Sequence, residues 1–107
     1  MISVVFYKHN GKYKEIKCEG HAEYVESGLD IVCASVSVLV ISCFNSVETF
    51  CHNDFVKSYD DDGMAVLQLK DNISHDCELL IDSLQFSLEK IIEQYGKKYL
   101  KISVKEV

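Results

Sequence analysis

Two residues able to perform catalysis together, a histidine and a cysteine, lie twelve positions apart at His21 and Cys33. Asp30 precedes the cysteine at the start of a long apolar segment, where an aspartate can cap the free N–H groups of a helix's first turn. That turn favours the thiolate, which is the nucleophilic form of cysteine. A cysteine on an apolar helix is also commonly a small core residue. Placement alone therefore leaves catalysis and packing both open.

His21 suits the role of a general base, because an imidazole beside a thiol can take its proton and later return one to a leaving amine. A histidine at a strand end can instead bond only to backbone. The segment between the two residues, Glu23 to Leu29, is polar and contains Gly28. We interpret it as a loop that folds His21 back toward Cys33. Because few apolar residues anchor it, we expect the loop from Ala22 to Leu29 to become ordered only when substrate binds.

Four neighbours are predicted to support this pair: Gly20, Asp30, Ala34 and Ser37. Backbone N–H groups near Cys33 and Ala34 are predicted to stabilise an oxyanion. Asp30 either orients His21 or caps the helix. Ser37, one turn after the cysteine, either touches the site or bonds back to a carbonyl. The predicted machinery is therefore a dyad.

Two hairpins and a final strand are predicted from alternating apolar residues. The first hairpin pairs residues 2–7 with 12–19 around Asn10-Gly11, a dipeptide that suits the positive φ angles of a tight turn. The second pairs residues 55–59 with 64–69 around a turn at 60–63. From Leu100 onward apolar and polar residues alternate again, which predicts a strand with one wet face.

Two helices are predicted from longer segments. Residues 74–96 have apolar residues every three or four positions and end at a glycine. Residues 31–51 are too long for a strand, and one helical face carries Val36, Val40, Phe44, Val47 and Phe50. Other faces of the 31–51 helix are also apolar, so this helix must be covered by other parts of the protein on both sides.

The predicted order is ββαββαβ, and it favours an α+β fold. We expect a two-layer α/β sandwich with an antiparallel or mixed five-stranded sheet and both helices on one face. A length of 107 residues suits one domain, spanning 1–107. The sheet and second helix cannot cover all of the first helix. A homodimer is therefore predicted to cover its remaining apolar residues: Val32, Val38, Leu39, Ile41 and Cys43.

Composition excludes several classes of protein. Seventeen acidic against eleven basic residues give a net charge of −6, which argues against direct nucleic-acid binding and favours a basic partner. A hydrophobic content of 48% argues against disorder. The longest apolar stretch, 31–44, is shorter than the roughly 20 residues that a bilayer requires, and no secretory pattern precedes it. We therefore expect a cytoplasmic protein with no membrane partner.

The remaining thiols and acids give no metal signature. Five cysteines, an odd number without an export signal, favour free thiols over disulfides. Cys43, Cys51 and Cys77 are interpreted as core or surface thiols, since the chain has no paired C-x-x-C spacing. The acidic run 60–62 lacks the later ligands of a calcium loop, including the distal glutamate. The sequence therefore predicts no cofactor and no metal.

The motif around the two candidate residues resembles a known family. Gly20-His21-Ala22, followed by residues 30–37 (DIVCASVS), is similar to the ribosomal-processing cysteine protease family Prp of Firmicutes and related bacteria. The resemblance implies a small α/β fold, a catalytic histidine at His21 and a nucleophile at Cys33. It also implies a homodimer that removes the N-terminal extension of large-subunit ribosomal protein twenty-seven, cutting after an aromatic residue. Ser35 stands where members often have a second alanine.

Two functional hypotheses follow. The first is a cysteine endopeptidase in which Cys33 attacks a peptide carbonyl, forms an acyl-enzyme and is assisted by His21. Its substrate is the extension of a basic ribosomal protein. The alternative is a non-catalytic dimeric module that binds a ribosomal protein or an assembly factor, with Cys33 as a packing residue. A redox-sensing thiol is disfavoured because no resolving cysteine lies near Cys33 in the sequence.

Overall fold

Seven elements follow one another in the order ββαββαβ. The computed structural model describes residues 1–20, 27–61 and 63–107. The elements are β1 (Ile2–His9), β2 (Lys12–Glu19), α1 (Ser27–Phe50), β3 (Phe55–Asp61), β4 (Met64–Leu69), α2 (His75–Tyr95) and β5 (Leu100–Glu106). This order confirms the sequence prediction.

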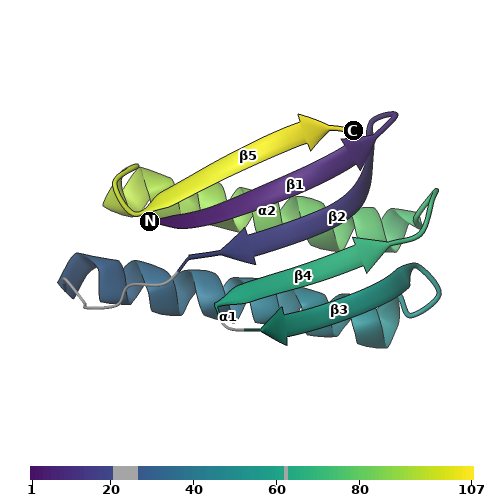
Figure 1. Ribbon diagram of the computed structural model, residues 1–107, viewed down its shortest axis with the longest axis horizontal. Helices are drawn as coiled ribbons and strands as arrows, with labels where there is room; N and C mark the ends of the chain where they lie inside the picture. The colour runs from purple at the N-terminus through teal and green to yellow at the C-terminus, as the bar shows by residue number, and fades with distance from the viewer. Residues whose placement is uncertain (21–26, 62) are drawn as a thin grey trace.

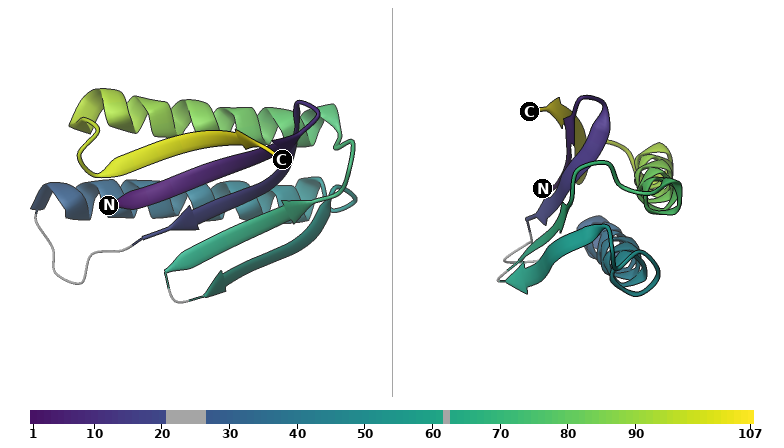
Figure 2. Two further views of the ribbon diagram at one scale, coloured as in Figure 1. Left: turned by 45° about the horizontal axis from the view of Figure 1, so that its top comes forward. Right: turned by 90° about the vertical axis from the view of Figure 1, so that its right-hand side faces the viewer.

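The five strands form one mixed sheet in the order β3-β4-β2-β1-β5 (Figure 1). β5 runs parallel to β1, whereas the pairs β1–β2, β2–β4 and β3–β4 are antiparallel. Each helix connects two strands that run in the same direction, so the chain must cross over one face of the sheet. Both helices lie side by side on that face, as Figure 2 shows. The predicted two-layer α+β architecture is confirmed.

Local sequence signals explain the ends of several elements. Asn10 and Gly11 adopt φ angles of 51° and 76°, as the tight turn between β1 and β2 requires. Ser74 caps α2 by accepting a hydrogen bond from the Cys77 N–H at 3.2 Å. At the other end the Gly96 N–H donates to the Ile92 carbonyl at 2.7 Å. The predicted bounds of α2 are therefore confirmed.

The core lies between the sheet and the two helices. Its sheet side includes Val4, Phe6, Ile16 and Leu67, which alternate along their strands. Its helix side combines one face of each helix and is fully or almost fully buried at Val32, Val36, Val40, Phe44, Val47, Ile81, Leu84 and Leu88. Removal of these apolar groups from water is the main favourable contribution to folding.

Helix α1 differs from its prediction in where it begins and in which residues form its buried face. It begins at Ser27, before the predicted start, so Asp30 lies inside the helix and does not cap it. Val32 is 1% exposed and belongs to the core, whereas Phe50 is 78% exposed. The reason is geometric: the buried face runs through Val47 and reaches Cys51 four residues later. Phe50 therefore points away from that face.

The length argument against a membrane span was also wrong. Residues Ile31–Phe50 lie in one helix that is long and apolar enough to cross a bilayer. The core helix of a globular protein has the same length and composition. One face of this helix, including Val36, Val40 and Phe44, packs into the core between the layers.

Candidate active site

Cys33 lies six residues after the start of α1, beyond the helix's first turn. The backbone N–H groups of Cys33 and Ala34 therefore fall within the hydrogen-bonded part of the helix. The oxyanion donors predicted near Cys33 and Ala34 are therefore not the free N–H groups of a first helical turn at these two residues. Asp30, as a helical residue, is likewise not the cap that the sequence predicted.

Cys33 is half-buried and lines a cavity of about 190 Å³ between the helix and the sheet. The cavity is bounded by α1, by the ends of β1 and β2, and by the β3–β4 hairpin. The apolar part of its lining consists of Ile2, Val36, Val40, Ile41 and Ala65. The polar or reactive side chains in the lining belong to Cys18, Cys33, Ser37 and Asp60. A nucleophilic thiol thus has space beside it for a substrate group.

Ser37 lines the same cavity one helical turn after Cys33. Of the two alternatives for this serine, the position facing the site is the one that the structure supports. Bonding back to a helix carbonyl occurs instead at Ser35, whose hydroxyl donates to the Ile31 carbonyl at 2.8 Å.

Cys18 and Asp60 are cavity residues that the sequence did not single out. Cys18 lies on β2 between Val4 and Ala65 of the flanking strands. Burial, followed by the charges of Asp60 and Cys33, raises the pKa of the Cys18 thiol to about 11. Asp60 belongs to β3 and not to the turn, where the sequence placed it. Alternation with Ile16 indicated which face Cys18 occupies, but nothing local indicated its neighbour on α1.

Gly20 fixes the path of the chain as it leaves β2. Its φ angle is 109°, and a Cβ at this position would overlap the carbonyl oxygen of Met1. Its N–H donates to the Gly63 carbonyl at 3.3 Å, which joins the end of β2 to the β3–β4 hairpin. Gly20 also lines the cavity. His21 and the loop residues Ala22 to Glu26 lie outside the described residues.

The other three thiols lie away from this cavity. Cys43 donates weakly to the Leu80 carbonyl at 3.6 Å, and burial raises its pKa to about 11. Cys51 and Cys77 are buried. Burial, followed by the neighbouring Cys51 and Asp54, raises the pKa of Cys77 to about 12. Cys33 is therefore the thiol that lies on helix α1 and also lines the cavity.

Comparison with known proteins gives a consistent result. A family model described as "Cysteine protease Prp" matches residues 1–101. The chain is 28% identical over 88 residues to the ribosomal processing cysteine protease Prp of Staphylococcus aureus strain NCTC 8325 / PS 47. That match covers 81% of this chain and 83% of the relative.

Solved structures agree. The essential ribosomal processing protease Prp from S. aureus in complex with a substrate peptide superimposes with a TM-score of 0.83 at 25% identity, over 98% of this chain and all of the other. The S. aureus protease with a covalently linked product peptide gives 0.80 at 26% identity, with the same coverage. SMU.848 from Streptococcus mutans shares the fold, with a TM-score of 0.80 at 22% identity over 100% of this chain and 96% of that one. The chain therefore belongs to the Prp family of ribosomal processing cysteine proteases.

Proposed function

We propose that this protease removes the N-terminal extension of a large-subunit ribosomal protein, with Cys33 as nucleophile and His21 as its acid–base partner. The observation that carries the proposal is the position of Cys33 in the wall of the cavity. Attack of the thiolate on the scissile carbonyl forms an acyl-enzyme and releases the amine, which takes its proton from the histidine. Water then hydrolyses the thioester. A covalently linked product peptide in the S. aureus relative supports an acyl-enzyme route.

The cavity also fits the proposed substrate. Its apolar wall, formed by residues such as Val36, Val40 and Ala65, suits an aromatic side chain next to the cut. Asp60 adds negative charge to the lining, and the whole chain carries a net charge of −6. Both features favour a basic protein as the substrate.

A homodimer and a cytoplasmic location complete the proposal. Helix α1 exposes Ile31 and Val38 on the side away from the core, and Val38 is 68% exposed. Pairing of two copies would remove this apolar surface from water. The cytoplasm is where a ribosomal protein substrate is available. Leu39 and Cys43, which were expected on this surface, pack instead against the core, and Val32 is inside it.

The experiment is a cleavage assay with the extended ribosomal protein as substrate. We expect the wild-type chain to shorten the substrate, as measured by intact mass, and to carry a transient peptide adduct on the thiol. Cys33→Ala and His21→Ala should lose cleavage, while Cys43→Ala, a thiol outside the cavity, should retain it. Cleavage by Cys33→Ala would overturn the proposal. Tight binding of substrate without cleavage by the wild type would instead support the non-catalytic module.

A further inference from the structure

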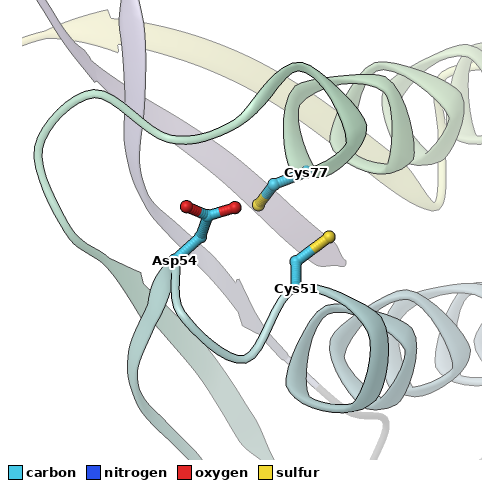
Figure 3. A group of neighbouring side chains, drawn as sticks. All are labelled: Cys51, Asp54 and Cys77. Carbon is cyan, nitrogen blue, oxygen red and sulfur yellow. The ribbon is translucent and has the colours of Figure 1, made fainter.

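Three side chains with metal-binding atoms meet at the end of α1 that is remote from Cys33. Cys51 directly follows α1, Asp54 precedes β3, and Cys77 lies in the first turn of α2 (Figure 3). Their sulfur and carboxylate oxygen atoms all lie within 4.8 Å of one another, and all three residues are buried. From Cys33 to Cys51 the helical rise corresponds to about 27 Å. Among the described residues, none of these three lines the active-site cavity.

The donor set is that of a zinc site. Zn²⁺ takes cysteine sulfur at about 2.3 Å and carboxylate oxygen at about 2.0–2.2 Å in tetrahedral geometry, which places neighbouring sulfurs about 3.8 Å apart. The observed atoms are close enough to reach this spacing by small side-chain rotations. Cys51 and Asp54 also have the two-residue spacing of a C-x-x-C zinc knuckle, with a carboxylate in place of the second thiol.

Hydrogen bonds already hold the three groups in place. The Asp54 N–H donates to the Cys51 carbonyl at 2.9 Å. The Ser74 hydroxyl donates to the Asp54 carboxylate and accepts from the Cys77 N–H. Each ligand is therefore tied to the next before any metal binds. Such support from groups behind the ligands is what orients a metal site and raises its affinity.

The charges also balance. Two thiolates and one carboxylate carry three negative charges, and Zn²⁺ supplies two positive ones. The third positive charge is supplied by Lys70, whose Nζ lies 3.5 Å from Asp54 Oδ1. A buried group of charges needs this neutrality, because uncompensated charge is costly away from water. Two exposed histidines lie close to the ligands in the sequence: His52 follows Cys51, and His75 lies two residues before Cys77.

We propose that Cys51, Asp54 and Cys77 bind one Zn²⁺ ion that joins the end of α1 to the start of α2. A water molecule, His52 or His75 completes the tetrahedron. The ion plays no part in peptide cleavage. It stabilises the junction because it binds the folded chain and not the separated segments of the unfolded one. Spacing along the sequence did not predict this site, because Cys77 joins the other two ligands only in the folded protein.

The test uses chelator-treated full-length protein titrated with Zn²⁺ alone. We expect one tightly held ion per chain by mass spectrometry of the metal, and a rise in Tm of at least about 4 °C. With Co²⁺ as a spectroscopic substitute, we expect thiolate charge-transfer bands and the visible bands of tetrahedral coordination. Cys33→Ala should bind equally well, which separates this site from the active-site thiol.

Cys51→Ala and Cys77→Ala should both lose the ion and the rise in Tm. Cys43→Ala, which removes a partly buried thiol outside the cluster, is the matched control and should keep both. Cys77→Ser keeps the side-chain size and tests binding if the alanine variant does not fold. A wild-type chain that holds no zinc at micromolar concentration would overturn the proposal. So would unchanged binding by Cys77→Ser, or a Cys51–Cys77 disulfide found in the protein purified without reductant.

Discussion

Cys18 and Cys33 line one cavity from opposite layers of the sandwich, the first from strand β2 and the second from helix α1. The two thiols also interact electrostatically. A negative charge on Cys33 raises the pKa of Cys18, in addition to the larger effect of burial and the effect of Asp60. Two thiols that share a cavity therefore do not share a role, because Cys18 stays protonated near neutral pH.

This difference predicts selective alkylation. Near pH 7.5 iodoacetamide should modify Cys33 at least tenfold faster than Cys18 or Cys43, whose pKa values are both raised to about 11. Only the thiolate reacts, and at that pH those two thiols are almost fully protonated. Peptide mapping by mass spectrometry measures the rates. Equal labelling of Cys18 and Cys33 in the folded protein would contradict the assignment of Cys33 as the nucleophile.

Gly20→Ala should inactivate the protease and destabilise it by more than about 1 kcal/mol. A Cβ at this position overlaps the Met1 carbonyl, and the φ angle of 109° is strained for any L side chain. Gly11→Ala is the matched control. Gly11 also has a positive φ, 76°, but a Cβ there would have no atom within 4 Å. This variant should therefore lose only the stability that a positive φ costs an alanine. Urea unfolding and the cleavage assay measure the two effects. Similar losses in both variants would contradict the close-approach argument.

The proposed dimer predicts different results for two adjacent residues. Val38→Glu should give a folded monomer, since this valine is 68% exposed on the outer side of α1. Leu39→Glu should unfold the chain, because Leu39 packs against the core and a charge there is buried. Light scattering measures the mass, and circular dichroism measures the fold. Val104→Glu, an exposed valine on β5, should remain dimeric. A Val38→Glu variant that stays dimeric would exclude this face as the interface.

The buried environment of Tyr13 predicts that the free energy of unfolding falls at alkaline pH. Its ring is buried, and its hydroxyl donates to Asp82 Oδ1 at 2.5 Å, with Gln85 Oε1 at 3.1 Å from the same hydroxyl oxygen. Burial and the Asp82 carboxylate raise the pKa of Tyr13 well above the ordinary 10.0. The folded protein therefore keeps a proton that the unfolded chain releases above pH 10. Stability from this group is complete below pH 10 and falls as the pH rises further.

Tyr13→Phe should remove that dependence. At pH 7 the variant should lose about 0.5–1.5 kcal/mol, the usual contribution of a hydrogen bond. Between pH 10 and 11 its unfolding free energy should fall less steeply than that of the wild type, as measured by urea denaturation. Parallel curves for the two proteins would show that Tyr13 titrates normally in the folded state.

Much of the fold could be predicted from local signals. The turn at Asn10-Gly11, the helix start near Ser74 and the stop at Gly96 each depend on a few neighbouring residues, and all three predictions are confirmed. Apolar residues at alternate positions indicated strands, and apolar residues every three or four positions indicated helices. Together these patterns predicted the order ββαββαβ. The motif from Gly20 to Ser37 indicated the protease family. These features depend on backbone geometry and side-chain type alone, which the sequence states directly.

Only the tertiary structure decided which distant residues meet. The parallel pairing of β5 with β1 set the strand order, and the packing of α1 on the sheet brought Cys33 to Cys18 and Asp60. Similarly, the adjacent ends of α1 and α2 brought Cys77 to Cys51 and Asp54. The helix start at Ser27 and the exposed Phe50 were also missed. Such contacts depend on sheet register and on how two helices share one face. A sequence with strand-like and helix-like apolar patterns is compatible with more than one strand order and more than one placement of its helices. Only the packing of the whole core selects one of these arrangements.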